Sequence, residues 1–439
     1  MNIFIVALAI LVLVIGIAWG KIHPFLAFLF VSIGAAIALG MPLAIVATSV
    51  RKGIGDILGS LLVVIVTGAM LGKLVVSSGA AERIAFVLVA RFGRTRIPWA
   101  MATTGLLVGI PLFYGVGFVL MVPIIFTIVA RYRLPAIAAG LPALAAMSVA
   151  HGLLPPHPAP TALVAQLDAN IGLTLLYGFM IAIPAIVIAG PLFSRTLVGI
   201  ASEPMVTCTS EPIPEELLPG VFVSIFSSLL PAVLLVVTSL LTLALPASTS
   251  LGAVIRFISE PDIVMLLALA TATWILGLAR GTSISALMKT YTEAGSDVAT
   301  ILLVIAGSGV LKEVLVASGV SVSIAQAMQR LPIDPLVLGW LVAAIIRACV
   351  GSATVAGLTA AGLLVPVVAN ADINPNLMVL SIGAGSLAFS HVNDGAFWLF
   401  KEYFRVSLFD TLRTWSVMET IVSLVGLAGV LLLDQFLSL

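Results

Sequence analysis

The sequence predicts an all-α membrane protein that crosses the lipid bilayer many times. Its 439 residues are 61% hydrophobic and only 9% charged, whereas an ordinary soluble protein carries roughly 25% charged residues. Apolar runs recur along the chain; since a membrane-spanning helix needs about 20 such residues, they predict about 10 to 12 spans. Proline- and glycine-rich interruptions within the apolar runs predict broken helices and helical hairpins.

Most apolar runs fit single spans, which we place at residues 2–19, 24–40, 56–77, 136–150, 172–194, 221–246, 262–280, 298–317, 376–390 and 415–436. Two longer stretches, 97–130 and 335–369, exceed one span. Basic residues favour the cytoplasmic side, so the arginines at both ends of the first stretch suggest that it enters and leaves on that side. We interpret both stretches as helical hairpins; the alternative is two short tilted spans each.

Residues 201–220 separate two membrane repeats, 1–200 and 221–439. This segment has four prolines, no Lys or Arg, and the carboxylates of Glu203, Glu211, Glu215 and Glu216. An acidic, proline-rich segment cannot bury enough apolar surface to pack, so we expect a linker loop.

The two halves resemble each other at a shift of 240 residues. This shift aligns Ile65 with Ile305 and His151 with His391. The order of a span, a Ser-Gly pair, a hairpin and an interrupted helix with a histidine is the same in both halves. Such repeats commonly have inverted topology and meet at a site near the bilayer midplane. We therefore predict two inverted repeats, each with a hairpin and a broken helix.

The first interruption, residues 151–161, contains four prolines and two of the four histidines. Consecutive prolines cannot continue a helix, and non-helical backbone at membrane depth must be buried in protein or line a wet cavity. Histidine titrates near neutral pH and can bind a polar ligand or a proton; for His157, a purely structural role is equally plausible. The candidates here are His151, His157 and Thr161, with Pro155 and Pro156 as the helix break.

The second interruption places Ser390, His391, Asn393 and Asp394 between apolar segments. Such polar groups are costly in lipid unless they face a cavity. We predict that His391, Asn393 and Asp394 belong to the site and that Asp394 is a candidate proton carrier. The alternative is that Asp394 caps the helix that follows it.

The hairpin tips supply the remaining candidates. Arg347 precedes a glycine-rich tip that carries Gly351, Ser352 and Thr354. Helix N-termini at such a tip form an anion site. A buried Arg is a natural partner of a substrate carboxylate. The alternatives for Arg347 are that it pairs with an acidic residue of the protein or that its side chain snorkels to the membrane surface. The first tip, 109–118, brings Tyr114 and the permissive backbone of Gly115 and Gly117.

No pattern indicates an enzyme, a cofactor or a resident metal. Metalloprotease, nucleophile-elbow, phosphate-loop and dinucleotide motifs are absent from the sequence. The net charge of +1 gives no sign of a nucleic-acid partner. An intramembrane enzyme with His151, His157 and His391 as metal ligands is a remote alternative with poor ligand spacing, and the paired interruptions disfavour a channel.

Three stretches identify the chain as similar to the GntP family of gluconate permeases: HGLLPPHPAPTA at 151–162, GSATVAG at 351–357 with Arg347 before it, and SHVNDGAFWLFKEYF at 390–404. The resemblance covers essentially the whole chain. It implies inner-membrane carriers that import gluconate and related sugar acids, usually with protons, while one branch takes D-serine. It also implies inverted repeats and a homodimer. The gluconate-type pattern has a Glu at the first tip where this chain has Gly115.

We therefore expect a secondary transporter in the inner membrane that imports gluconate, or a related small hydroxylated carboxylate, by proton symport. The organic anion would lie between the hairpin tips and the broken helices, held by helix N-termini, Ser352, Thr354 and Arg347. His151, His391 and Asp394 would orient hydroxyls or carry the proton. A D-serine carrier and a sodium-coupled carboxylate carrier are the alternatives, because carbonyls at unwound helices also suit Na⁺.

Overall fold

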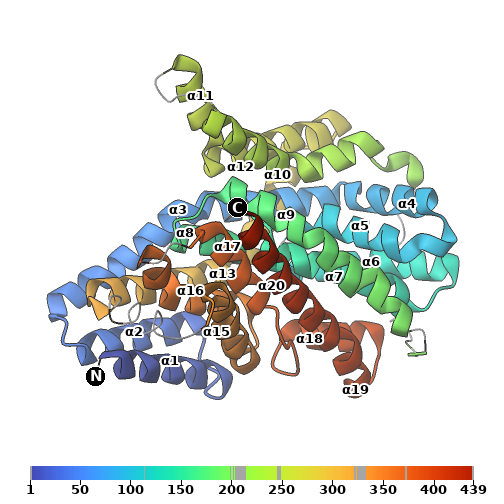
Figure 1. The fold of residues 1–439 in the computed structure, drawn as a ribbon. Coiled ribbons are helices and arrows are strands. Elements are labelled where there is room, and N and C mark those ends of the chain that lie inside the picture. The colour runs from blue at the N-terminus through green and yellow to red at the C-terminus, as the bar shows by residue number, and fades with distance from the viewer. Residues whose placement is uncertain are drawn as a thin grey trace.

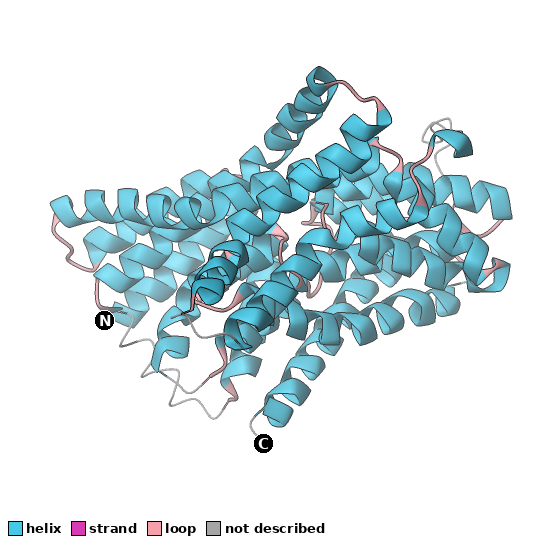
Figure 2. Ribbon diagram, turned by 90° about the horizontal axis from the view of Figure 1, so that it is seen from above, coloured by secondary structure: helices cyan, strands magenta, loops and turns pink. Residues whose placement is uncertain are grey.

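The computed structural model describes residues 2–437 except 113, 198, 201, 203–213, 245–248, 321, 322, 324–332, 371 and 372. The regular elements in these residues are all helices, as the sequence predicted (Figures 1 and 2). The α-helices are α1 (Asn2–Ala18), α2 (Pro24–Ala38), α3 (Leu43–Ser77), α4 (Ala80–Phe92), α5 (Ile97–Gly109), α6 (Tyr114–Tyr132), α7 (Ala136–Leu153), α8 (Pro158–Gln166), α9 (Ile171–Val187), α10 (Val221–Ala244), α11 (Ser250–Ser259), α12 (Pro261–Ala272), α13 (Ile284–Ala317), α15 (Pro335–Val350), α16 (Ala353–Asn370), α17 (Pro375–Gly385), α18 (Gly395–Phe404), α19 (Leu408–Thr411) and α20 (Val417–Leu437).

Seven helical segments in the described part of the chain are long and apolar enough to cross a membrane. They are Leu43–Ser77, Ala136–Gln166, Ile171–Leu197, Val221–Thr242, Pro261–Arg280, Ile284–Ala317 and Leu408–Leu437. Shorter apolar helices, such as α1 and α2, supplement them. Single π-helical turns join α9, α12 and α19 to the segments that follow, so that α19 and α20 form one continuous helix.

Helices α3 and α13 are much longer than the spans predicted at 56–77 and 298–317. They have 35 and 34 residues, and the charged residues that suggest span ends are paired across the two helices. Lys73 Nζ lies 2.9 Å from Asp297 Oδ2, and Lys52 Nζ lies 2.8 Å from Glu313 Oε2. The helices pack against each other and touch at Gly53, where an added Cβ would lie 2.5 Å from the carbonyl oxygen of Gly309.

The element order repeats in the two halves as the 240-residue shift predicts. The shift carries Leu43–Ser77 onto residues 283–317, within a residue of the observed α13 (Ile284–Ala317). Likewise α5 and α6 correspond to α15 and α16, and α7 and α8 to α17 and α18. The inverted orientation of the two repeats stays a prediction.

Both predicted hairpins are pairs of helices joined by short turns. Helix α5 has 13 residues, or about 20 Å at 1.5 Å per residue. This is shorter than the roughly 30 Å hydrocarbon core, so α5 alone is too short to cross it. Phe113, in the first turn, lies outside the described residues.

The two helix breaks meet in the interior. Helix α7 ends at Leu153 and α8 begins at Pro158, with a cis peptide bond between Pro155 and Pro156. Helix α17 ends at Gly385, five residues before the predicted end of its span, and the chain is non-helical until α18. The carbonyl of Gly152 lies so close to Gly383 that a side chain would not fit there. The breaks are therefore packed on each other.

Most of the predicted linker, including Glu203 and Glu211, lies outside the described residues. Its end is fixed by α4, since Arg83 Nη2 donates to the carbonyl of Glu215 at 2.7 Å and Arg83 Nε donates to the carbonyl of Pro219 at 2.9 Å.

Candidate functional site

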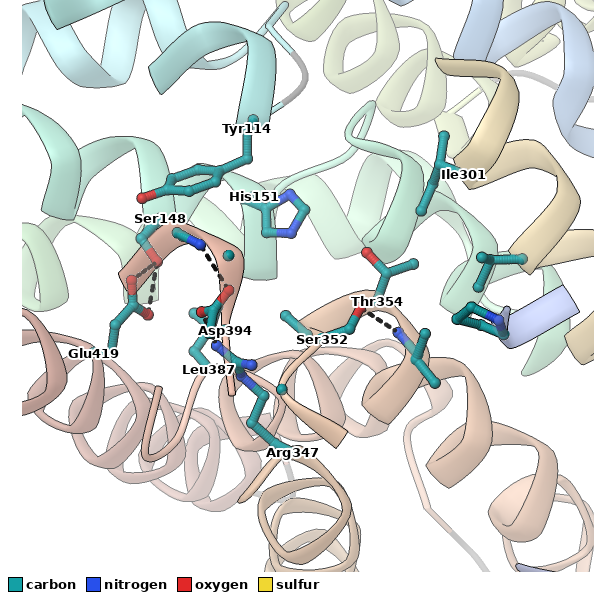
Figure 3. A pocket seen from close by; sticks show the side chains of 18 of the residues that line it. Tyr114, Ser148, His151, Ile301, Arg347, Ser352, Thr354, Leu387, Asp394 and Glu419 are labelled. Atoms are coloured by element: carbon teal, nitrogen blue, oxygen red, sulfur yellow. Dashed lines mark hydrogen bonds and ion pairs between the residues drawn. The ribbon is translucent and has the colours of Figure 1, made fainter. Parts of the chain in front are cut away.

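A cavity of about 430 Å³ lies beside the second helix break (Figure 3). This is within the range of small-molecule sites, roughly 300 to 1,000 Å³. Helices α7, α13, α15, α16 and α20, both hairpin tips and the start of α18 contribute to its wall. The polar side chains that line it are Tyr114, Ser148, His151, Asp297, Thr300, Arg347, Ser352, Thr354, Asp394, Trp415 and Glu419.

Arg347 and Asp394 form an ion pair at the cavity wall. Arg347 stands in the last turn of α15 and is 3% exposed. Asp394 precedes α18: its Oδ1 accepts from the backbone N–H of Ala396 at 2.9 Å, while its Oδ2 contacts Arg347 Nη2 and accepts from the hydroxyl of Ser390. Asp394 therefore caps α18, which was the alternative given for Asp394. It is also the internal acid that was given as an alternative partner for Arg347.

Two nitrogens of Arg347, Nε and Nη1, have no hydrogen-bond partner among the described residues. An unpaired buried donor is costly, and a guanidinium presents its donors as a planar fork that matches a carboxylate. The ion pair with Asp394 therefore uses only part of the hydrogen-bonding capacity of Arg347.

The tip of the second hairpin adds a helix N-terminus to the same wall. Ser352 and Thr354 lie at the start of α16, and Ser352 Oγ accepts from the N–H of Val355 at 3.4 Å. Gly351 has a φ of 78° and lies against the carbonyl of Asn393, which leaves no room for a side chain. The free N–H groups at such a helix start favour an anion.

The opposite wall contains Tyr114, Ser148, His151 and Glu419 (Figure 3). The rings of Tyr114 and His151 are 5.3 Å apart between centroids. Glu419 of α20 is 2% exposed, and its two carboxyl oxygens lie 2.7 and 2.8 Å from Ser148 Oγ. The sequence interpretation missed Glu419 and Ser148, although a lone carboxylate inside the predicted span 415–436 is itself a signal of function.

Four predicted site residues are absent from the cavity wall. His157 is buried and its Nε2 donates to the carbonyl of Gly109 at 2.8 Å, while Thr161 Oγ1 donates to the carbonyl of His157 at 2.7 Å. His391 Nε2 and Asn393 Nδ2 both donate to the carbonyl of Ala348, at 3.0 and 2.9 Å. These contacts fix the breaks to the two hairpins, and a role of these four side chains in transport stays a prediction.

The glycines of the first tip have different surroundings. Gly115 lines the cavity, whereas Gly117 packs on α7, where an added Cβ would lie 2.7 Å from Met147 Cε. No group of three or more His, Cys, Asp or Glu residues that could hold a metal ion occurs within the described residues. The structure therefore gives no support to the remote metalloenzyme alternative.

Long apolar helices around a polar cavity, with helix breaks and a hairpin tip at its wall, define the class of this protein as a multi-pass membrane transporter. The family model of the GntP family permeases matches residues 1–436, and the chain belongs to this family. It is a permease and not an enzyme.

Relatives of similar length support this assignment. The chain is 42% identical to a high-affinity gluconate transporter of Escherichia coli over 436 residues, covering 99% of this chain and 100% of the relative. It is 42% identical to the Gnt-II system L-idonate transporter of the same species, covering 100% of both. It is 40% identical to a gluconate permease of Bacillus subtilis, covering 99% of both.

Solved structures share the fold at low sequence identity. The YdaH transporter of Alcanivorax borkumensis superposes with a TM-score of 0.65 at 16% identity, covering 94% of this chain and 97% of that one. MtrF of Neisseria gonorrhoeae gives a TM-score of 0.66 at 15% identity, covering 95% and 96%.

Proposed function

We propose that the protein imports gluconate or a closely related sugar acid by proton symport across the inner membrane, and that it works as a homodimer. The observation that carries the substrate class is the pair of unpartnered nitrogens on the buried Arg347, at the wall of a polar cavity. Relatives that are named for gluconate and L-idonate, two hydroxylated carboxylates, support it.

The carboxylate of the substrate would bind Arg347 Nε and Nη1. Charge-assisted, two-point bonds between arginine and carboxylate are among the strongest hydrogen bonds in proteins. The N-terminus of α16, with Ser352 and Thr354, would add N–H and hydroxyl donors. When the site is empty, Asp394 balances the charge of Arg347.

The hydroxyl chain of the substrate would extend toward the opposite wall. Tyr114, Ser148 and His151 can each donate or accept a hydrogen bond there. A polyhydroxylated acid needs several such partners, because each hydroxyl that loses water without a replacement bond weakens binding. The polar groups of this wall support a polyhydroxylated acid as the substrate.

The test is uptake of labelled gluconate into proteoliposomes under an inward proton gradient in sodium-free buffer. We expect uphill accumulation that a protonophore abolishes and that unlabelled L-idonate inhibits. Uptake that requires sodium would overturn the proton coupling and leave the substrate class standing. Failure to take up or bind any sugar acid under either gradient would overturn the substrate class. Light scattering of the purified protein tests the dimer.

A further inference from the structure

We infer that Glu419 is the residue that binds and releases the coupling proton. The inference rests on the proposed proton symport and assigns its proton to a specific carboxyl group. Glu419 lies on α20 at the cavity wall, and no predicted site residue belongs to that helix (Figure 3).

The contact with Ser148 suits a carboxyl group that carries a proton. Ser148 Oγ lies within 2.8 Å of both carboxyl oxygens of Glu419. A serine hydroxyl has one hydrogen and two lone pairs, so it cannot donate a straight hydrogen bond to both oxygens. If one oxygen of Glu419 carries a proton, that oxygen donates to Ser148 while Ser148 donates to the other.

The charged groups near Glu419 do not supply a dedicated cation. The titratable and charged groups that line the same cavity are Tyr114 of α6, His151 of α7, Asp297 of α13, Arg347 of α15 and Asp394 at the start of α18. The cation among them, Arg347, is already paired with Asp394. Within the described residues, no ion pair involves Glu419. A buried carboxylate without a counter-ion is costly, so a proton is its natural partner.

The wall has two further carboxyl groups. Asp297 is paired with Lys73, whose Nζ lies 2.9 Å from its Oδ2, and Asp394 is less suited than Glu419 to exchange a proton. Its Oδ1 caps α18, and its Oδ2 is shared by Arg347 and Ser390. Protonation of Asp394 would weaken the ion pair and leave Arg347 as a buried, uncompensated charge. Protonation of Glu419 breaks no contact and preserves both carboxyl contacts with Ser148.

Electrostatics then links the proton to the substrate. Asp394 and Asp297 are each paired with a cation, Arg347 and Lys73. When Glu419 is ionised, an entering carboxylate therefore meets one additional negative charge; when Glu419 is protonated, it does not. Like charges at close range repel strongly in a low dielectric. Proton and anion therefore favour each other's binding, and by linkage the effect is reciprocal. The proton bound from outside leaves the carboxyl oxygen into the inner solution as the substrate departs.

The test uses Glu419→Gln, which keeps the shape of the side chain and removes the titrating group. In proteoliposomes, we expect this variant to lose proton-driven accumulation of labelled gluconate but to retain exchange of labelled for unlabelled gluconate, which moves no net proton. The matched control is Glu402→Gln, an exposed glutamate paired with Lys401, which should accumulate gluconate as the wild type does. Uphill accumulation by Glu419→Gln would overturn the inference.

A second variant, Ser148→Ala, decides the matter if Glu419→Gln does not fold. The serine hydroxyl contacts both carboxyl oxygens of Glu419, so its loss should change the balance between the protonated and ionised forms. The pH profile of uptake should then shift by about one unit; an unmoved profile would overturn the inference. Wild-type protein that shows no proton-driven uptake at all would instead refute the proposed symport.

Discussion

Replacing Arg347 by lysine separates the two functions that the structure gives this side chain. Lysine keeps a positive charge beside Asp394 but lacks the fork formed by Nε and Nη1, the nitrogens left free for a ligand. Alanine is less informative, because it leaves Asp394 unpaired, and breaking a buried ion pair costs about 3 to 5 kcal/mol.

The size of the effect follows from the bonds that are lost. A hydrogen bond to a charged group contributes about 1.5 to 3 kcal/mol, and each 1.4 kcal/mol changes affinity about tenfold. The loss of one such bond in Arg347→Lys should therefore raise the Kd for gluconate roughly 10- to 150-fold. The Tm of the substrate-free protein should fall much less than in Arg347→Ala.

Isothermal titration calorimetry of the purified protein measures the Kd, and thermal unfolding without substrate measures the Tm. The matched control is Arg413→Lys, an exposed arginine whose Nη1 lies 4.0 Å from Asp410 Oδ1; it should bind gluconate as the wild type does. If Arg347→Lys binds gluconate with unchanged Kd, the carboxylate does not use this fork, and the substrate placement argued above is refuted.

Three further substitutions test the structure around the cavity. Gly351→Ala should lower the Tm and abolish binding, because a φ of 78° and the adjacent backbone exclude a side chain. The control Gly362→Ala, where the nearest atom to an added Cβ is 4.0 Å away, should change neither. Equal Tm values for the two variants would refute this. His157→Ala should destabilise the protein by about 1 to 3 kcal/mol, the cost of a buried group left unsatisfied. The gluconate Kd should stay close to that of the wild type, since His157 is absent from the cavity wall. A large change in Kd at unchanged Tm would place His157 in the substrate site. Gly115→Glu adds a carboxylate at the cavity wall, where the gluconate-type pattern also has one. Gluconate binding should persist, and its Kd should depend more steeply on pH than that of the wild type; an identical pH dependence of the Kd would contradict this.

The sequence predicts the breaks and tips well because their signals are local. Paired prolines and a glycine-rich turn end helices wherever they occur, so the break after Leu153 and the tip at Gly351 could be located without a structure. The alignment of the halves also predicts the correspondence of α3 with α13.

The direction of side chains within the breaks could not be predicted in the same way. A helix or strand has a period that assigns each residue to a face, but the non-helical residues 386–394 have none. His391 and Asn393 turn to the carbonyl of Ala348, while Asp394 faces the cavity. The contact of Ser148 with Glu419 joins residues 271 positions apart, and no local pattern indicates it.

The charges at the cavity wall bear on how the membrane potential acts on the carrier. Under the proposed coupling, the empty site holds ionised Glu419 beside the balanced pair of Arg347 and Asp394. The loaded site holds a neutral Glu419 and one substrate carboxylate, so these groups carry the same net charge in both states. Since the potential does work only on net charge that moves, one substrate would cross with one proton without electrical current. The pH gradient alone would then set how far the substrate accumulates.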